Sequence, residues 1–321
     1  MTPLALQEPA RPLSVDFAIE RAKEYARASR SSATRRAYGS DLRDFGRFCR
    51  DHGVCALPAT SQTIALYVTD LAERAKVSTI RRRLVAIAGE HKRAGIDPAP
   101  TSDRVVREIL RGIANTKGCA VRRKDALTLD RLQSVLLAVA GDDLKAKRDR
   151  AIVLLGFAAA LRRSEIAALG VGDIRYDPRG LLITIRRSKT DQAGEGAAIA
   201  VPFVPTHALC AARAVKAWIA AAQLVDGPLF RSFKPGRRIS DRPIGGRDVA
   251  NLVHVLVRRA RLEGDFSAHS LRAGFITAAS VAHVSLDNIM RTSRHRSLAV
   301  LQGYIRRANV FDDPALAAII L

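Results

Sequence analysis

One short stretch near the C-terminus combines residue types that can do chemistry. The segment TSRHRSLAVLQGYIRRA, residues 292–308, places Tyr304 between arginine pairs, with His295 nine positions upstream. A tyrosine hydroxyl is a weak nucleophile in bulk water, because its unperturbed pKa is about 10. Neighbouring cations make the phenolate easier to form. The alternative is a surface tyrosine on an amphipathic helix whose arginines form a solvated face.

Three other segments carry further basic, acidic and imidazole side chains. They are LRRSEIAAL with Arg162 and Glu165, RRSKTDQAGEG with Lys189, and HSLRAG with His269 and Arg272. Each has an ordinary structural explanation: an ion pair at a helix end, decoration of a hairpin, and a helix cap. With His295 and Tyr304, however, these segments bring two arginines, two histidines, a lysine and a tyrosine into one domain.

This set of side chains suits displacement at a phosphodiester. The reaction places further negative charge on the equatorial oxygens, which planar guanidinium groups match bidentately. Preorganised donors of this kind stabilise the transition state. The leaving alkoxide needs a proton, which a lysine or a histidine can supply as a general acid. The expected intermediate is a covalent phosphotyrosine, and the absence of a carboxylate cluster in the sequence argues against two-metal hydrolysis.

Helical patterns dominate the first third of the chain. After an expected N-terminal tail at residues 1–12, apolar residues recur at helical spacing up to Gly118. The four segments are SSATRRAYGSDLRDFGRFCRDHG, SQTIALYVTDLAERA, STIRRRLVAIAGEHKRAG and SDRVVREILRGIANTKG. Residues 13–118 are therefore predicted to form an all-helical domain. The basic stretch 119–126 has no apolar period, which favours a linker.

Residues 127–321 are predicted to form a second domain of α+β type. A capped helix starts at Thr128, and one buried helix, RDRAIVLLGFAAALRRSEIAALG, starts at Arg148. The apolar period then changes to two on either side of a turn at 177–180, and AAIAVPF supplies a third strand. Helices then resume. The predicted fold class is mainly α, with a small antiparallel three-stranded sheet in the second domain and a short helix at the C-terminal tail.

The order of these motifs resembles that of the tyrosine site-specific recombinases, the phage integrase family, and of its Cre-like members in particular. ALRRSEIAAL is similar to the family's Gly-Leu-Arg-x-Ser-Glu box, HSLRAG to its His-x-x-Arg box, and the step from His295 to Tyr304 matches its spacing. The first and third helical segments resemble helices of the family's SAM-like core-binding domain. The resemblance covers nearly the whole chain. It implies a DNA recombinase that needs no metal, ATP or other cofactor.

The resemblance also implies how the scissile phosphate is held. Arg162 and Arg272 would clamp it, and His295 would donate a hydrogen bond to it. Glu165 would support this arrangement by orienting the first arginine and histidine.

The covalent step and its proton transfers would involve three further residues. Tyr304 would attack the phosphate and give a 3′-phosphotyrosine with a free 5′-hydroxyl. Lys189 would protonate the leaving 5′ oxygen, and His269 would assist proton transfer near the nucleophile.

The sequence departs from the family pattern at three positions near these boxes. Ala160 stands where the family usually has glycine, and Arg163 replaces a residue that is commonly apolar. Arg294 precedes His295 where glycine is typical and would suit a tight turn. None of these departures removes a catalytic side chain.

The charge balance points to a polyanionic partner. The chain has 53 lysines and arginines against 31 acidic residues, a net charge of +22 at pH 7. Double-stranded DNA is the leading candidate and an anionic membrane surface the second. No apolar run reaches the roughly 20 residues that span a bilayer, so we expect a cytoplasmic, DNA-associated protein. Arg82, Arg83, Arg247 and Arg258 are candidates for reading DNA, with a solvated basic face as the alternative.

The end of the chain, FDDPALAAIIL at 311–321, carries four large apolar residues and predicts an interaction site. We expect it to dock in trans on a neighbouring protomer, as part of a ring-closed homotetramer with a dimer on each of two DNA sites. Packing on its own domain is the alternative. At the level of function, the alternatives are a type IB topoisomerase and a non-catalytic DNA-binding regulator derived from an integrase.

Overall fold

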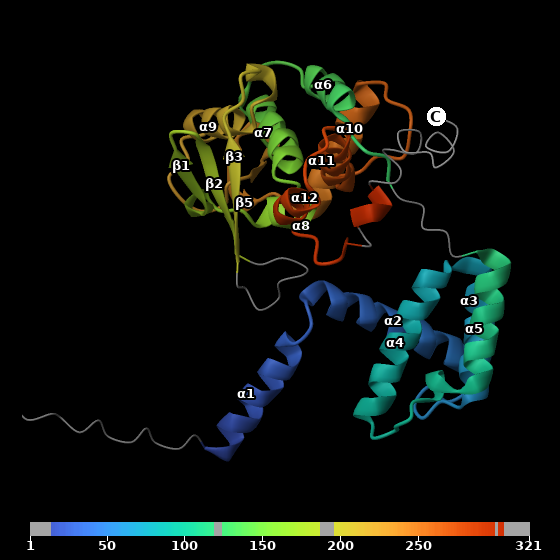
Figure 1. Cartoon of the computed structure of the whole chain (residues 1–321). Coiled ribbons are helices and arrows are strands. Elements are labelled where there is room, and N and C mark those ends of the chain that lie inside the picture. Colours follow the sequence, from blue (N-terminus) through green and yellow to red (C-terminus); the bar gives the residue numbers. More distant parts are fainter. Residues whose placement is uncertain (1–13, 119–123, 187–195, 299–300, 305–321) are drawn as a thin grey trace, which may run out of the picture. The chain divides into compact units, whose positions relative to one another are not determined.

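The computed structural model describes residues 14–118, 124–186, 196–298 and 301–304 of the chain (Figure 1). Its internal contacts divide the chain into two units, residues 1–121 and 122–321, and each unit is considered by itself. Lys189 and the segment 305–321 lie outside the described residues, as does the expected N-terminal tail.

Among its described residues the first unit contains helices and no strand, as predicted. It contains α1 (Val15–Ala28), α2 (Ser32–Asp51), α3 (Ser61–Arg74), α4 (Val77–Arg93), the 3-10 turn η1 (Pro100–Ser102) and α5 (Arg104–Lys117). Hydroxyl and carboxylate side chains cap four of these helices: Ser14 before α1, Ser31 before α2, Thr60 before α3 and Asp103 before α5. The four predicted segments correspond to α2–α5, whose apolar faces form one core around Ile64, Tyr67 and Ile80.

The second unit combines helices with two small sheets (Figure 1). Its helices are α6 (Leu129–Leu137), α7 (Leu144–Ala158), α8 (Arg163–Ala168), α9 (Ala211–Ala221), α10 (Gly246–Arg259), α11 (His269–Val281) and α12 (Leu286–Ser293), with 3-10 turns η2 (Val171–Asp173), η3 (His207–Leu209) and η4 (Pro235–Arg237). Its strands are β1 (Ile174–Asp177), β2 (Gly180–Ile185), β3 (Ala197–Pro202), β4 (Arg231–Phe233) and β5 (Ile239–Pro243).

The predicted three-stranded sheet is present and antiparallel, in the order β1–β2–β3. Ile183 lies opposite Ile174 on one side and Ile199 on the other, and it is completely buried. The turn before β2 needs the glycine at 180, because a Cβ atom there would lie 2.2 Å from the Val201 carbonyl oxygen. The two-stranded sheet β4–β5 is an addition to the predicted architecture.

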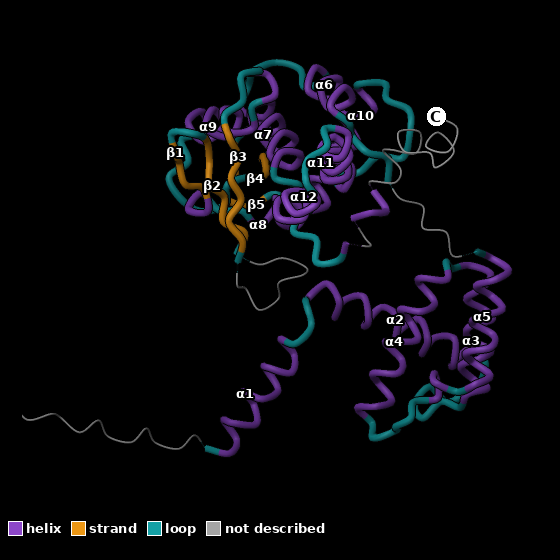
Figure 2. Tube along the Cα trace, viewed as in Figure 1, coloured by secondary structure: helices purple, strands orange, loops and turns teal. Residues whose placement is uncertain are grey.

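Helix α7 is the centre of the second unit. Residues on every side of it are buried, among them Ile152, Val153, Leu154 and Leu155, as expected of a helix enclosed by other elements. It packs against α8, α9, α10 and α11. In Figure 2 the strands β1–β3 lie on one side of this unit, and α10–α12 lie on the other. No helix in the described part of the chain is long and apolar enough to cross a bilayer.

The prediction of one continuous buried helix from Arg148 to Gly170 is wrong. Helix α7 ends at Ala158, and α8 begins only at Arg163. Between them, Ala160 adopts a left-handed conformation with φ of 47°. The carbonyl oxygen of Ala160 accepts a hydrogen bond from Arg272, which lies more than a hundred positions later in the chain. A local pattern cannot reveal a break that depends on such a distant partner.

Candidate active site

Three parts of the second unit bring the predicted catalytic side chains together. Arg162 is the N-cap residue of α8, and His269 and Arg272 lie on the first turn of α11. His295 follows α12, and Tyr304 is helical, within the described residues 301–304. Side-chain hydrogen bonds connect α11 directly to the two later residues, so the predicted convergence of these segments is observed in the structure.

The Tyr304 hydroxyl points to an imidazole. Its oxygen lies 2.7 Å from Nε2 of His269, which is exposed at the start of α11. The Tyr304 ring packs against the small apolar cluster that contains Ile276 and Ile289. This cluster supports the ring while leaving the hydroxyl at the polar end, as is usual for a partly buried tyrosine.

Arg272 is buried at 1% exposure and is held by hydrogen bonds from its guanidinium. Nη1 donates to the Ala160 carbonyl oxygen at 2.7 Å, and Nη2 lies 3.2 Å from Nδ1 of His295. Burial, and to a lesser extent the nearby positive charge of Arg162, lowers the pKa of Arg272 to about 9. Arg272 therefore keeps its charge at neutral pH and presents it in a largely water-excluded setting.

His295 is held in place from two sides. Besides its contact with Arg272, its Nδ1 lies 2.8 Å from the hydroxyl of Ser293, a residue that is completely buried. Burial lowers the pKa of His295 to about 3, and the positive charges of Arg272 and Arg162 act in the same direction. The ring is therefore neutral at physiological pH and retains one N–H donor.

The Glu165 carboxylate organises the arginines. Arg162 donates to it twice, from Nη1 to Oε1 at 2.6 Å and from its backbone N–H to Oε2 at 2.9 Å. Arg294 donates from Nη2 to Oε2 at 2.7 Å. Burial opposes ionisation of this carboxyl, but the charges of Arg294 and Arg162 and the backbone N–H outweigh it, and the pKa of Glu165 is lowered. Arg162, at 18% side-chain exposure, still reaches solvent.

Two contributors to this geometry carry no clear signal in the sequence. Arg294 stands out there only as a departure from the family's glycine. Gly274 closes the motif HSLRAG, and a Cβ atom there would lie 1.9 Å from the Leu127 carbonyl oxygen. Only glycine lets the segment before α6 approach α11 this closely, and the Leu127 N–H then donates to the Ser270 carbonyl oxygen at 3.0 Å.

Comparison with known proteins decides which family this arrangement belongs to. Residues 126–309 match the model of the phage integrase family, and residues 24–92 match that of the phage integrase N-terminal SAM-like domain. The chain belongs to the phage integrase family. The family and the class of enzyme predicted from the sequence, a tyrosine recombinase that acts on DNA, are thereby confirmed.

This phage integrase family member has similar relatives in bacteria. It is 36% identical over 299 residues to an integrase/recombinase XerD homolog of Selenomonas ruminantium, covering 92% of this chain and 88% of the relative. It is 26% identical to a tyrosine recombinase of Synechocystis, slr0733, covering 88% of both chains.

Solved structures are similar to this integrase family member in fold. A lambda integrase dimer bound to a COC′ core site gives a TM-score of 0.61 at 15% identity, over 91% of this chain and 77% of the other. The Tn1549 transposon integrase in complex with transposon right end DNA gives 0.59 at 16% identity, over 90% and 96%. The predicted mainly helical fold with its small sheet is confirmed.

The four arginines that we predict to read DNA differ in how they are held. Arg247, in the first turn of α10, and Arg258, in its last turn, are exposed. Arg82 on α4 is 41% exposed and forms an ion pair with Asp41, whose side chain is 2% exposed.

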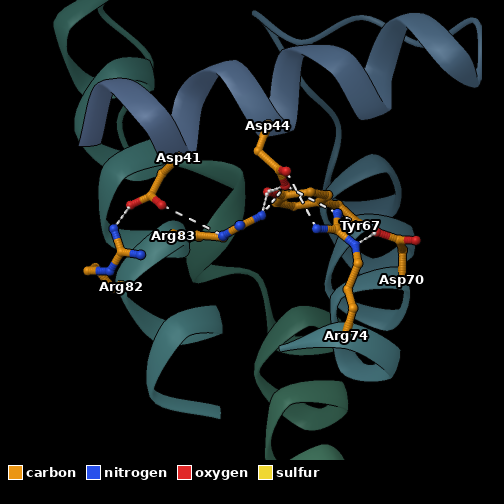
Figure 3. A network of polar contacts seen from close by, with 7 residues as sticks. All are labelled: Asp41, Asp44, Tyr67, Asp70, Arg74, Arg82 and Arg83. Carbon is orange, nitrogen blue, oxygen red and sulfur yellow. Dashed lines mark hydrogen bonds and ion pairs between the residues drawn. The ribbon is translucent and has the colours of Figure 1, made fainter. Parts of the chain in front are cut away.

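Arg83 lies deeper in the first unit, at 16% side-chain exposure (Figure 3). Its Nη1 forms an ion pair with Asp44 and donates to the Tyr67 hydroxyl at 2.9 Å, while Tyr67 donates to Asp44 at 2.8 Å. Burial raises the pKa of Tyr67, and its bond to Asp44 raises it further, so this hydroxyl stays protonated. Arg83 is thus part of a polar network that joins α2, α3 and α4.

Proposed function

We propose that this recombinase breaks and rejoins DNA at a defined site through a 3′-phosphotyrosine on Tyr304. The observation that carries the proposal is the 2.7 Å contact between the Tyr304 hydroxyl and Nε2 of His269, within the same site as Arg272 and His295. A hydroxyl in contact with a base and close to fixed cations is the arrangement that nucleophilic catalysis requires.

Binding of the scissile phosphate falls to the two arginines and to His295. Arg272 is fixed by the Ala160 carbonyl and Arg162 by Glu165, so neither guanidinium has to be ordered when the phosphate enters. Such preorganised cations stabilise the charge that develops on the equatorial oxygens. His295 is neutral, and its N–H donates to a phosphate oxygen without requiring a change of protonation.

The covalent step needs two proton transfers. The Tyr304 oxygen attacks phosphorus, its proton passes to Nε2 of His269, and a new O–P bond forms as the bond from phosphorus to the 5′ oxygen breaks. We assign protonation of that 5′ oxygen to Lys189, which lies outside the described residues. The attack of a 5′-hydroxyl on the phosphotyrosine reverses these steps, so rejoining needs no external energy source.

DNA contacts are assigned to exposed arginines on both units. Arg247 and Arg258 on α10 and Arg82 on α4 are accessible to a duplex, and phosphate contacts of this type position a protein before bases are read. Arg83 acts differently in this proposal, because its ion pair with Asp44 holds the α4 face in place. A DNA-associated, cytoplasmic location follows from this function.

Assembly into a tetramer, with a dimer on each of two sites, is assigned to the apolar tail 311–321. The second unit has a cavity of about 670 Å³ between α6, α7 and α9, lined by apolar residues such as Leu136, Leu154 and Ala214. Its charged lining is Lys147, Arg150 and Arg213 with Asp142, which pairs with the first two. The excess of cations suits the tail's acidic pair next to its apolar residues. Docking of the tail into this cavity of a neighbouring protomer closes the ring.

Recovery of DNA that is covalently joined to the protein tests the function. The full chain is expressed, protein–DNA adducts are isolated under denaturing conditions, and the attached DNA is sequenced across the genome. We expect adducts that share one sequence with the parent protein and none with Tyr304→Phe, because phenylalanine lacks the attacking oxygen. The adducts should carry 3′-linked protein and a free 5′-hydroxyl.

The competing functions give different results in the same experiment. A type IB topoisomerase would give adducts without a shared sequence, together with relaxation of supercoiled DNA. A non-catalytic regulator would give no adduct with the parent protein, although it would still bind DNA.

A further inference from the structure

Arg294 occupies a backbone position that disfavours an arginine. It ends α12 in the left-handed conformation, with φ of 55° and ψ of 42°. L-amino acids with a Cβ atom adopt this conformation at a cost in free energy, whereas glycine adopts it readily. A residue in such a conformation is held there by its surroundings. For Arg294, the contacts of its side chain are the candidates.

The Arg294 guanidinium joins three segments of the chain. Its Nη1 donates to the Thr292 carbonyl oxygen at 2.9 Å and to the Ala159 carbonyl oxygen at 3.3 Å. Its Nη2 donates to Glu165 at 2.7 Å. The side chain is only 9% exposed. Arg294 therefore connects the loop that carries His295 to the break between α7 and α8 and to the carboxylate of α8.

Two guanidinium groups hold consecutive carbonyls at that break. Arg294 binds the carbonyl of Ala159, and Arg272 binds that of Ala160, which is itself left-handed with φ of 47°. The chain resumes its helix just after Arg162. The orientation of the Arg162 side chain therefore depends on the 159–162 loop, whose carbonyls are bound by Arg272 and Arg294.

Glu165 depends on Arg294 in a second way. Its side chain is 1% exposed, and Arg294 binds Oε2, the same oxygen that accepts the Arg162 backbone N–H. Removing the Arg294 charge would leave a buried carboxylate with Arg162 as its remaining ion-pair partner among the described residues. A buried charge that loses a partner reorients or takes up a proton, and either change disturbs Arg162.

We propose that Arg294 is a positioning residue for strand cleavage, which holds Glu165 and the 159–162 loop so that Arg162 meets the scissile phosphate. The inference rests on the proposed function, because it concerns the rate of the phosphotyrosine step. Arg294 acts through other residues in this role and does not contact the reacting atoms.

The test compares cleavage rates with DNA affinity in the full-length protein. Arg294→Met keeps the length of the stem and removes the charge and the hydrogen bonds. We expect single-turnover cleavage about 10²-fold slower, as for other small misplacements of catalytic groups, with the Kd for DNA within about threefold of the parent's. The ammonium of Arg294→Lys can bind Glu165, but it cannot bind both carbonyls at the same time. This variant should therefore cleave about tenfold faster than Arg294→Met.

Two further variants separate positioning from backbone strain and from general charge. Arg294→Gly relieves the left-handed backbone but should still cleave slowly, because the guanidinium contacts are lost. Arg291→Met makes the same chemical change on an exposed residue of α12 that contacts Asn288, and it should cleave within about twofold of the parent.

A double-mutant cycle with Glu165→Gln decides whether Arg294 acts through Glu165. If it does, Arg294→Met combined with Glu165→Gln should cleave little more slowly than Glu165→Gln alone, because residues that share one network are not additive. Fully additive effects, or cleavage by Arg294→Met within about threefold of the parent, would overturn the proposal. A parent protein that forms no adduct would instead refute the proposed function, so the two failures are distinguishable.

Discussion

His295 shows how the position of a single residue sets its chemistry. The sequence places it nine positions before Tyr304 but cannot give its charge, since histidine titrates near neutral pH when unperturbed. In the fold it lies partly buried beside Arg272 and within reach of other cations. A protonated ring would add another positive charge to this site, so the neutral form is favoured. We therefore propose that this residue acts as a hydrogen-bond donor rather than as a general acid.

The pH dependence of cleavage checks this assignment. Because the pKa of His295 is lowered to about 3, its protonation state should not change between pH 5 and pH 8. His295→Gln keeps a neutral N–H donor and should cleave within about tenfold of the parent, whereas His295→Ala, which removes the donor, should be about 10²-fold slower.

The acid limb of the pH–rate profile gives the decisive comparison for His295. Single-turnover cleavage by the parent and by His295→Gln should show the same limb. An inflection near pH 6.5 in the parent that disappears in the variant would show that His295 titrates during the reaction, contrary to the assignment.

At the scale of elements, the polar network in Figure 3 fixes the helices of the first unit to one another. Asp44 on α2 accepts from Tyr67 and pairs with Arg74, both on α3, and with Arg83 on α4. Burial works against ionisation of Asp44, but its hydrogen bonds with Arg74 and Tyr67 and the charge of Arg83 outweigh it, so its pKa is lowered. The Asp44 carboxylate of α2 therefore bonds to side chains of both α3 and α4.

Asp44→Asn should loosen this unit. The amide cannot balance the two guanidinium charges, and we expect a loss of about 2 kcal/mol, typical of hydrogen bonds to charged groups. Amide hydrogen exchange in α2 and α4, followed by mass spectrometry, should become about 30-fold faster at neutral pH.

The stabilising contribution of Asp44 should depend on pH. The pKa of Asp44 is lower in the folded state than its ordinary 3.8, so its contribution is complete above that value and is lost as the pH falls below it. The difference in the free energy of unfolding between the parent and Asp44→Asn should therefore shrink in acid.

Asp70→Asn is the control. It removes an exposed partner of Arg74, and it should lower the free energy of unfolding by less than about 1 kcal/mol. Equal effects of the two variants would refute a special role for Asp44.

At the scale of the whole molecule, the proposed assembly on DNA requires the apolar tail 311–321 to dock on a neighbouring protomer. The cavity between α6, α7 and α9 offers an apolar lining with cations close by. Its position in the second unit leaves α10 and the exposed arginines of that helix available to DNA. Assembly and DNA binding can thus be impaired separately.

A substitution in the cavity should block assembly without weakening DNA binding. Ala217 lines the cavity and is exposed, so Ala217→Glu places a charge in the path of the tail. We expect at least about tenfold less tetramer on two DNA sites, measured by analytical ultracentrifugation, and unchanged binding to one half-site. Deletion of residues 312–321 should have the same effect.

Ala220→Glu is the control, since Ala220 is exposed on the same helix and is not among the residues that line the cavity. Normal tetramers with the Ala217→Glu variant would exclude this cavity as the docking site. A tail deletion that lowers thermal stability but leaves tetramers intact would show that the tail packs on its own domain.

Much of the fold could be predicted because its signals are local. Amphipathic patterns predicted α2–α5, and the change to a period of two around Gly180 predicted β1–β3. The pair β4 and β5 was missed, because strands of three and five residues around Pro235 carry too few positions to establish a period. The break before Arg162 was missed because neither glycine nor proline marks it.

The sequence by itself determined the family and predicted the residues that carry its chemistry: a tyrosine, two histidines and two arginines at the family's spacing, in a chain of high positive charge. Only the tertiary structure decided how those groups are held. It lowered the pKa of His295, placed Arg83 in a network with Asp44, and brought Arg294 into contact with Glu165. The physical reason is that charge, burial and hydrogen bonding depend on neighbours in space, and Arg294 and Glu165, for example, lie 129 positions apart in the chain.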